Sequence, residues 1–307
     1  MITVSIPATT ANLGPGFDCL GLALSLYNTV EMAPAATWHI EISGEGADSL
    51  SRSYDNLVWQ AAICLWKKAG VVPPIVKITL HNQIPLARGL GSSSAAIVGG
   101  LVAANSFLAS PLPLEHLLDI ATEIEGHPDN VAPALYGGLA ASACEGGTVY
   151  SRPLALCPSL RFVVCVPEFS LPTALARQAL PQDVPHKDAV FNVSRTVLLV
   201  QALQQGDAQL LRFASADKLH QPYRQSLIRG YSDVRSHALA AGAAAVMISG
   251  AGPTMLAITQ SSDTSSMCNA MEQGFASQGI TSRAIELTPC KKGAHSVPVR
   301  VRGNKRN

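Results

Sequence analysis

Residues 85–97 read PLARGLGSSSAAI, a run rich in glycine and serine that continues directly into an apolar stretch. A flexible linker would have polar residues on both sides, which this segment lacks. A dinucleotide fingerprint needs a third glycine where Ser94 stands and an acidic residue about 20 positions later, which is not obvious here. A Walker loop ends in Gly-Lys-Ser or Gly-Lys-Thr, and no lysine follows Gly91. Two interpretations remain: a serine-capped buried helix, or a glycine turn leading into a phosphate-binding helix N-terminus.

The phosphate interpretation has a physical basis in these residue types. Gly89 and Gly91 let the backbone approach a ligand closely, because glycine has no Cβ atom. The three serines would stand at the first residues of the helix, where free backbone N–H groups and the positive end of the helix dipole favour an anion. Serine hydroxyls also bind phosphate oxygens or a magnesium ion. On this segment alone, the two interpretations have equal weight.

Composition places the chain among ordinary globular proteins. It has 307 residues, 48% of them apolar, which is enough for one large domain and fits two packed domains better. The 22 Lys and Arg residues nearly balance the 21 Asp and Glu residues. Charge therefore gives no reason to expect nucleic acid or an acidic membrane as a partner.

The cysteines and the apolar runs bear on the compartment. Seven scattered cysteines without a C-x-x-C pair fit reduced thiols better than a disulfide or zinc framework. The sequence begins without the basic and apolar regions of a signal peptide, and no apolar run reaches the roughly 20 residues of a membrane span. We therefore expect a cytoplasmic globular protein, most simply an enzyme or a ligand-binding protein.

Hydrophobic periodicity predicts alternating strands and helices in both halves of the chain. The helix expected over 55–69 has a polar residue to cap it, two lysines in its last turn and Gly70 to end it. The expected strands are 2–6, 38–43, 75–81, 161–166, 244–248, 254–259 and 283–287; the other expected helices are 92–108, 114–125, 172–180, 189–205, 232–241 and 263–278. This alternation indicates an α/β or α+β protein with a boundary near 150–165.

Three segments of the chain resemble the GHMP kinases, the family that includes galactokinase, homoserine kinase, mevalonate kinase and phosphomevalonate kinase. P-x-x-x-G-L-G-S-S-S-A, here Pro85–Ala95, is similar to the ATP-phosphate motif of that family. PATTANLGPGFDCLGLAL (Pro7–Leu24) and SGAGPTMLAI (Ser249–Ile258) resemble the same family, and the three motifs follow in the family's order. Within the family the resemblance is closest to the homoserine kinases, through ANLGPGFD, EGHPDNVAPA and HQPYR-x-x-L-I.

The resemblance implies an α+β fold, the two-domain GHMP kinase fold, with ATP and substrate bound at the junction between the halves. Residues 1–158 would form an ATP-binding domain that is similar to the second domain of ribosomal protein S5. Residues 159–300 would form a ferredoxin-like domain, and 301–307 a disordered tail. The implied activity is ATP-dependent phosphorylation of the L-homoserine hydroxyl in threonine biosynthesis, by a homodimer.

For the substrate, the resemblance implies a site for an amino-acid zwitterion. Asp18 would pair with the ammonium group, and Asn12 would hydrogen-bond nearby. Arg177 and Arg224 would bind the carboxylate, which a guanidinium fork suits better than a lysine does. The other expected substrate contacts are Thr173, one helical turn before Arg177, and His127, Gly250 and Gly252. Taken singly, each has an ordinary alternative as a surface charge, a turn residue or a loop histidine.

For the nucleotide, the resemblance implies that the glycine-serine turn holds the β- and γ-phosphates. Asn56 resembles an adenine contact, although a helix N-terminal position explains an asparagine equally well. Magnesium is expected because kinases use it to neutralise charge on the phosphates. Ser93 and Glu123 would be its ligands, with Glu125 as the alternative carboxylate because it faces differently on the helix. The expected nucleotide-binding residues are Asn56, Pro85, Leu86, Ala87, Arg88, Gly89, Leu90, Gly91, Ser92, Ser93, Ser94 and Ala95.

The expected mechanism needs no general base. The position of a catalytic aspartate in mevalonate kinase-like relatives corresponds to Asn130, which is a poor proton acceptor. Asp129 adjoins it, but its side chain is equally suited to capping the following segment. We therefore expect direct attack of the hydroxyl on the γ-phosphate, with Asn130, Asp129 and Arg177 contributing alignment and charge stabilisation. Two alternatives stay open: another small-molecule kinase of the family, and a nucleotide-binding regulator without turnover on the same fold.

Overall fold

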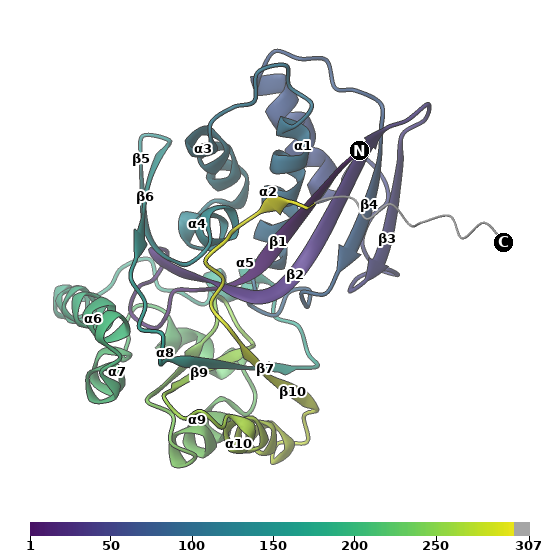
Figure 1. The fold of residues 1–307 in the computed structure, drawn as a ribbon. Coiled ribbons are helices and arrows are strands. Elements are labelled where there is room, and N and C mark those ends of the chain that lie inside the picture. Colours follow the sequence, from purple (N-terminus) through teal and green to yellow (C-terminus); the bar gives the residue numbers. More distant parts are fainter. Residues whose placement is uncertain (298–307) are drawn as a thin grey trace.

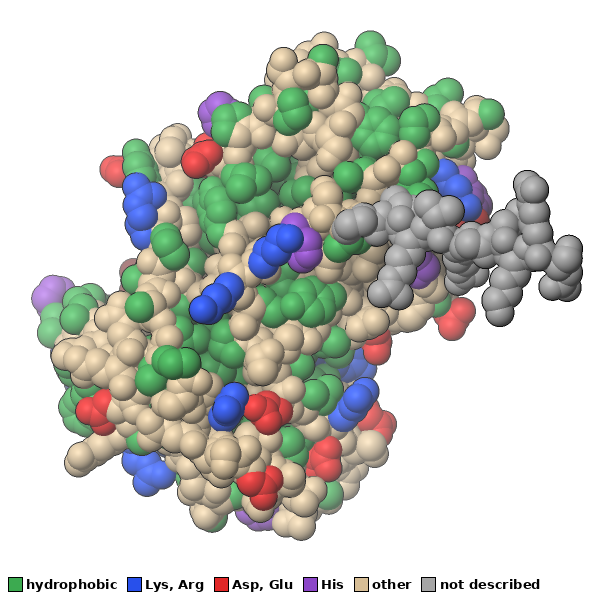
Figure 2. Space-filling model, in the orientation of Figure 1, with side chains coloured by type: hydrophobic (Ala, Val, Ile, Leu, Met, Phe, Trp, Pro, Cys, Tyr) green, Lys and Arg blue, Asp and Glu red, His purple; other side chains and the backbone are tan. Residues whose placement is uncertain are grey.

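The computed structural model describes residues 1–297 and contains two sheets, each with helices packed against it (Figure 1). The first sheet and its helices form the upper part of Figure 1, and the second sheet lies below them. In the lower part of the face in Figure 2, basic and acidic side chains are interspersed, which agrees with the nearly balanced charge of the sequence.

The first sheet has the strand order β11-β1-β2-β4-β3, and β5 joins it beside β2 and pairs in turn with β6. Strands β3 and β4 are parallel, whereas the other paired strands of this sheet are antiparallel. The strands are β1 (Ile2–Ala11), β2 (Leu20–Pro34), β3 (His39–Gly44), β4 (Val76–Asn82), β5 (Leu139–Glu145), β6 (Thr148–Leu154) and β11 (His295–Ser296). The connection between β1 and β2, residues 12–19, leaves the sheet at the end that faces the second half of the molecule (Figure 1).

Helix α2 (Ser92–Asn105) explains the apolar run that follows the glycine-serine segment. It packs on β1 and β2 and also touches α1 (Leu57–Lys68), α3 (Leu114–Glu125) and α4 (Pro128–Tyr136). A Cβ on Gly99 would lie 2.7 Å from Cγ2 of Val30, and one on Gly100 would lie 2.4 Å from the carbonyl oxygen of Val58. Larger side chains would overpack this contact, so the two glycines let α2 lie close to the sheet and to α1.

The second sheet is antiparallel with the order β10-β7-β9-β8. Its strands are β7 (Arg161–Pro167), β8 (Ala245–Ile248), β9 (Met255–Thr259) and β10 (Ser282–Leu287), and α9 (Tyr231–Ala240) and α10 (Ser265–Ala276) pack on it. The segment between β7 and β8 also forms α5 (Thr173–Gln178), α6 (His186–Gln205), α7 (Ala208–Ala214), α8 (Gln221–Arg224) and a 3-10 turn, Gln225–Leu227. Side chains of β7 alternate between two cores: Phe162 and Val164 join the larger one, and Val163 and Cys165 join the smaller. Strands β8 and β9 contribute to both cores in the same way, so the two halves pack together through this sheet.

The expected α+β fold is confirmed. The boundary placed between residues 158 and 159 falls in the connection from β6 to β7. One cut does not separate the sheets, however, because β11 returns to pair with β1 through Val4 and Ser296 (Figure 1). The expected tail, 301–307, lies outside the described residues. Among residues 1–297, no helix has both the length and the apolar character needed to cross a bilayer.

Candidate active site

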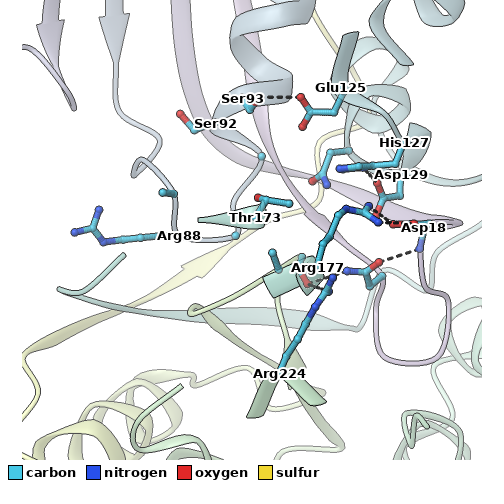
Figure 3. Close-up of a pocket in the computed structure, with 17 residues that line it drawn as sticks. Asp18, Arg88, Ser92, Ser93, Glu125, His127, Asp129, Thr173, Arg177 and Arg224 are labelled. Atoms are coloured by element: carbon cyan, nitrogen blue, oxygen red, sulfur yellow. Dashed lines mark hydrogen bonds and ion pairs between the residues drawn. The ribbon is translucent and has the colours of Figure 1, made fainter. Parts of the chain in front are cut away.

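A cleft opens where the loop after β1, the glycine-serine segment, the start of α4, and helices α5 and α8 converge (Figure 3). Most of the residues expected from the sequence line it together, although they come from both halves of the chain. They are Asn12, Asp18, Ala87, Arg88, Gly89, Gly91, Ser92, Ser93, His127, Asp129, Asn130, Thr173, Arg177, Arg224 and Gly250. Glu125 and Ala251 line the cleft as well.

The glycine-serine segment is a tight turn that no larger residue would allow. Gly89 and Gly91 have φ values of 78° and 71°, in the left-handed region that favours glycine. A Cβ on Gly89 would lie 2.2 Å from the carbonyl oxygen of Ser249, and one on Gly91 would lie 1.9 Å from Oγ1 of Thr9. Strand β1 holds the turn through a hydrogen bond of 3.1 Å from the Thr9 N–H to the Leu90 carbonyl. The backbone conformation is therefore fixed before any ligand binds.

Helix α2 begins directly after this turn and presents its N-terminus to the cleft. Its first intrahelical backbone bond runs from the N–H of Ala95 to the carbonyl of Gly91, at 2.9 Å. The preceding N–H groups, of Ser92, Ser93 and Ser94, therefore lack intrahelical partners, as at any helix start. Ser92 and Ser93 line the cleft. Together with the helix dipole, these groups favour a bound phosphate.

Glu125 is the carboxylate that meets the serines. Ser93 Oγ donates to its Oε2 at 2.8 Å (Figure 3). Ser94 Oγ donates to its Oε1, also at 2.8 Å. Glu123, the residue expected from the sequence, instead lies 2.9 Å from Nζ of Lys68, and its side chain is 65% exposed. Glu123 lies outside the cleft lining because two residues on a helix are about 200° apart, so only one of the two can face α2. Gly126, with a φ of 90°, ends α3 directly after Glu125.

Asp18 and Arg177 face each other within the cleft (Figure 3). Arg177 donates from Nη2 to Oδ1 of Asp18 at 2.7 Å and from Nη1 to Oδ2 at 3.1 Å, a bidentate pair. Asn12 supports the same loop, since its Oδ1 accepts from the backbone N–H of Asp18 at 3.0 Å and its Nδ2 donates to the carbonyl of Gly250 at 2.8 Å. Each charge is thus satisfied by the other.

Arg224 is a buried cation, 1% exposed, whose guanidinium reaches the cleft. Burial lowers its pKa to about 10, with the nearby charge of Arg177 acting in the same direction. No carboxylate of the described residues forms an ion pair with it within 4.0 Å. A buried cation without a paired anion is well suited to an anionic ligand, because the ligand would repay the desolvation of the guanidinium.

His127 and Asp129 form a second charged pair at the start of α4. Nδ1 of His127 lies 2.5 Å from Oδ1 of Asp129, and the Asp129 side chain is 2% exposed. Burial opposes protonation of the imidazole, but the hydrogen bond and charge of Asp129, aided by Glu125, raise the pKa of His127 above its usual value. The neighbouring Asn130 accepts at Oδ1 from Thr9 Oγ1 at 2.8 Å, which anchors α4 beneath the phosphate turn.

Several expected residues do not reach the cleft lining. Asn56 caps α1: its Oδ1 accepts from Val58 N–H at 3.0 Å and its Nδ2 donates to the Ser51 carbonyl at 2.7 Å. With both ends of its amide used, the side chain has the structural role considered as the alternative to an adenine contact. Leu90, Ser94 and Ala95 are buried below the turn. Pro85, Leu86 and Gly252 also lie outside the lining.

Arg88 fixes the turn to the second half of the chain. Its Nε donates to the carbonyl of Pro167 at 3.0 Å, its Nη1 to that of Leu86 at 3.0 Å, and its Nη2 to that of Glu168. Figure 3 shows its side chain directed away from the centre of the cleft. The guanidinium thus joins the glycine-serine turn to the end of β7, a role that the sequence analysis did not predict.

Models of two known domains match this chain. The GHMP kinases N terminal domain matches residues 56–138, and the GHMP kinases C terminal domain matches residues 199–276. The chain belongs to the GHMP kinase family. It is 46% identical over 294 residues to a homoserine kinase of Moorella thermoacetica, covering 96% of this chain and 99% of that one. A homoserine kinase of Carboxydothermus hydrogenoformans is also 46% identical, over 295 residues, covering 96% of each chain.

Solved structures of GHMP kinases agree with the fold. The crystal structure of a homoserine kinase from Cytophaga hutchinsonii is 30% identical and superposes with a TM-score of 0.87, covering 96% of this chain and 97% of that one. A mevalonate kinase structure, 13% identical with a TM-score of 0.67, shares the fold. The expected family and two-domain architecture are therefore confirmed.

Proposed function

We propose that this GHMP kinase transfers the γ-phosphate of ATP to the side-chain hydroxyl of L-homoserine, forming O-phospho-L-homoserine in threonine biosynthesis. The observation that supports this most is one cleft with a phosphate-binding turn on one side and opposite charges for a zwitterion on the other. The homoserine kinases named above, alike over nearly their whole length, support the same substrate.

The zwitterion would replace an ion pair that the protein already has. Asp18 would take the ammonium group, and Arg177 and Arg224 would take the carboxylate, so the Asp18–Arg177 pair would exchange partners on binding. Because both charges are about one-third exposed, separating them costs little. Arg224 has no such pair to lose, and we assign it the larger share of carboxylate binding.

The donor groups in the cleft fit magnesium. Ser93 offers a hydroxyl and Glu125 a carboxylate, both hard oxygens that already lie together beside the helix start. When bound there, magnesium would neutralise charge on the ATP phosphates. Ser92 and Ser93 N–H groups would hold the phosphates themselves, and Gly89 and Gly91 would keep the backbone close to them.

The transfer step needs alignment more than a base. The homoserine hydroxyl oxygen forms a bond to the γ-phosphorus while the bond to the β,γ-bridging oxygen breaks, and ADP leaves with that electron pair. The hydroxyl proton passes to an oxygen of the transferred phosphoryl group and from there to solvent. Asn130 accepts no proton usefully, and Asp129 is already held by His127. The raised pKa of His127 favours its charged form, which would add positive charge beside the transferred group.

Asp129→Asn tests the base-free step. Because the residue would hold His127 rather than accept the hydroxyl proton, we expect a loss of kcat of about 10-fold or less, smaller than the roughly 100- to 10,000-fold that removal of a general base costs. Loss of all turnover with both substrate affinities intact would show that Asp129 is the base. The measurement is steady-state kinetics with each substrate varied separately.

An ADP-release assay with ATP, magnesium and L-homoserine tests the function. We expect turnover with homoserine and a large loss for Arg177→Ala at unchanged ATP affinity. The same assay is run with a panel of other alcohols that includes mevalonate and serine. Turnover with one of these and none with homoserine would show that the protein is a GHMP kinase for a different substrate. ATP binding without transfer to any acceptor would show a regulator. The homodimer and the cytoplasmic location stay predictions from the sequence.

A further inference from the structure

His220 is a buried histidine next to the site, and the mechanism above gives it no task. It precedes α8 in the segment HQPYR and is 0% exposed. Its Nε2 lies 2.7 Å from the carbonyl oxygen of Gly14, and its Nδ1 lies 3.2 Å from Nη1 of Arg224. The ring therefore connects the loop that bears Asp18 to the arginine assigned to the carboxylate.

The two partners decide the protonation of the ring. A carbonyl oxygen only accepts, so Nε2 must carry the hydrogen that bonds to Gly14. A guanidinium only donates, so Nδ1 must be bare to accept from Arg224. Burial lowers the pKa of His220, with Asp217 opposing and Arg224 reinforcing the shift, which agrees with a neutral ring. Oδ2 of Asp217 also lies 3.4 Å from Nε2, a second acceptor that agrees with a hydrogen on that nitrogen. Asp217 is itself held by the backbone N–H groups of Leu219, His220 and Gln221 and by Nδ2 of Asn192.

The remaining contacts of Arg224 show what the histidine adds. Nε donates to the Ala176 carbonyl at 3.2 Å, and Nη1 also donates to the Gly250 carbonyl at 3.3 Å. Within residues 1–297, Nη2 has no hydrogen-bond partner. Phe17 lies against the same group, with its ring 5.2 Å from the Arg224 guanidinium carbon and stacked on His220 at 5.3 Å. His220 supplies the only side-chain hydrogen bond that Arg224 makes in the described part of the chain.

We propose that His220 is a positioning residue for the substrate carboxylate. Its neutral ring accepts from Nη1 of Arg224, which leaves Nη2 without a partner among the described residues, and its Nε2–H fixes Gly14. The carboxylate-binding and ammonium-binding groups are thereby held at one separation, because Gly14 lies in the loop of Asp18. The inference rests on the proposed function and adds a residue that selects for an α-amino acid.

Two conservative variants separate the two bonds of the ring. His220→Asn places an amide oxygen near the Nδ1 position and keeps an acceptor for Arg224. His220→Gln places an amide nitrogen near the Nε2 position and keeps the donor to Gly14, but loses the acceptor. Asn105→Ala is the control for general destabilisation, since it removes two hydrogen bonds to Leu112 of a side chain that is 9% exposed and distant from the cleft lining.

The test compares homoserine with 2-aminobutane-1,4-diol, in which a hydroxymethyl group replaces the carboxylate. We expect His220→Gln to raise the KM for homoserine about 10-fold, since the lost bond involves a charged group, and His220→Asn to raise it less than about 3-fold. The inhibition constant of the diol and the KM for ATP should change less than about 2-fold in both variants, because neither ligand has the carboxylate that Arg224 binds. The melting temperature of all three variants is measured beside the kinetics, so that a general loss of stability can be recognised.

Three results would overturn the proposal: a wild-type KM for homoserine in His220→Gln, equal losses for homoserine and the diol, or equal effects of the two histidine variants. If Asn105→Ala reproduces the selective loss of homoserine, the effect is one of stability and the proposal also fails. If the wild-type protein itself does not phosphorylate homoserine, the proposed function has failed instead.

Discussion

The two sides of the cleft use different parts of the chain: one presents backbone groups and the other presents side chains. The side proposed for the phosphates is backbone: a turn with two glycines in the left-handed region and the first N–H groups of α2, held by Thr9 and by the three carbonyls around Arg88. The side proposed for the amino acid is made of side chains, which satisfy one another through the Asp18–Arg177 pair. The first is fixed without a ligand, and the second must exchange partners to bind one.

This difference determines how each side fails. A backbone site has no side chain to delete, so it fails when an atom is added where the chain has no room. A side-chain site fails when a charged side chain is removed. Only the binding of the ligand group that paired with that side chain is then weakened. The predictions below separate these two kinds of failure, from the largest expected effect to the smallest.

Gly91→Ala should have the largest effect. The new Cβ would lie 1.9 Å from Oγ1 of Thr9, so the turn must move, and a shift of about 1 Å can cost about 100-fold in turnover. Gly70→Ala is the matched control: it has a φ of 68° and no atom within 4 Å of the added Cβ. It should lose about 1 kcal/mol of unfolding free energy and keep full activity. Equal activity of the two variants would contradict the account of the turn.

Asp18→Asn should weaken the binding of homoserine and leave the binding of ATP unchanged. Removing a charged hydrogen-bond partner of the ammonium group predicts a KM for homoserine about 10- to 100-fold higher. Asp188→Asn is the control, since Asp188 pairs with Lys218 at 2.8 Å outside the cleft lining. Initial rates with each substrate varied give both constants. A matching rise in the KM for ATP would mean that Asp18 supports the whole cleft and not the ammonium site.

Glu125→Gln and Glu123→Gln test which carboxylate serves magnesium. We expect the magnesium concentration for half-maximal rate to rise about 10-fold or more in Glu125→Gln, as for other changes at metal sites. Glu123→Gln removes an exposed pair with Lys68 and should change stability by no more than about 0.5 kcal/mol, without changing the magnesium requirement. The measurement is the reaction rate of each variant as a function of magnesium concentration. A larger rise of the half-maximal magnesium concentration in Glu123→Gln than in Glu125→Gln would refute the assignment.

The smallest predicted effect concerns pH. The pKa of His127 is raised in the folded chain, so its protonation stabilises the fold fully below the unfolded value of about 6.5. That contribution is lost as the pH rises through the raised folded value. The difference in unfolding free energy between the wild type and His127→Asn should therefore decrease as the pH rises above about 6.5. Denaturant unfolding measures it, and a difference independent of pH would contradict the raised pKa.

The sequence predicted the backbone side of the cleft better than the side-chain side. Helical periodicity and the glycines marked the turn before α2, because such conformational requirements are local. Strand β2 and helix α4 were missed: β2 is long and buried on both faces in its first part, so it does not alternate, and α4 contains Pro133, which usually ends a helix.

The side-chain partners depend on contacts between distant segments. Asp18 and Arg177 are 159 positions apart, and Gly14 and His220 are 206 apart, so neither pair is visible in local spacing. The segments GPGFD and HQPYR did indicate where the substrate site lies. They assigned no role to Phe17 or His220, because an aromatic ring and a histidine are usually explained by packing in a core. For Glu123 and Glu125, the sequence could say only that they face apart, and the structure showed which one meets the serines.

The most direct test of the central claim is a crystal structure with a non-hydrolysable ATP analogue and L-homoserine bound together. The account predicts the γ-phosphate at the N–H groups of Ser92 and Ser93, and the homoserine carboxylate on Arg224 with its ammonium group on Asp18. An analogue whose phosphates lie away from the start of α2, or homoserine bound with its carboxylate facing Asp18, would contradict it.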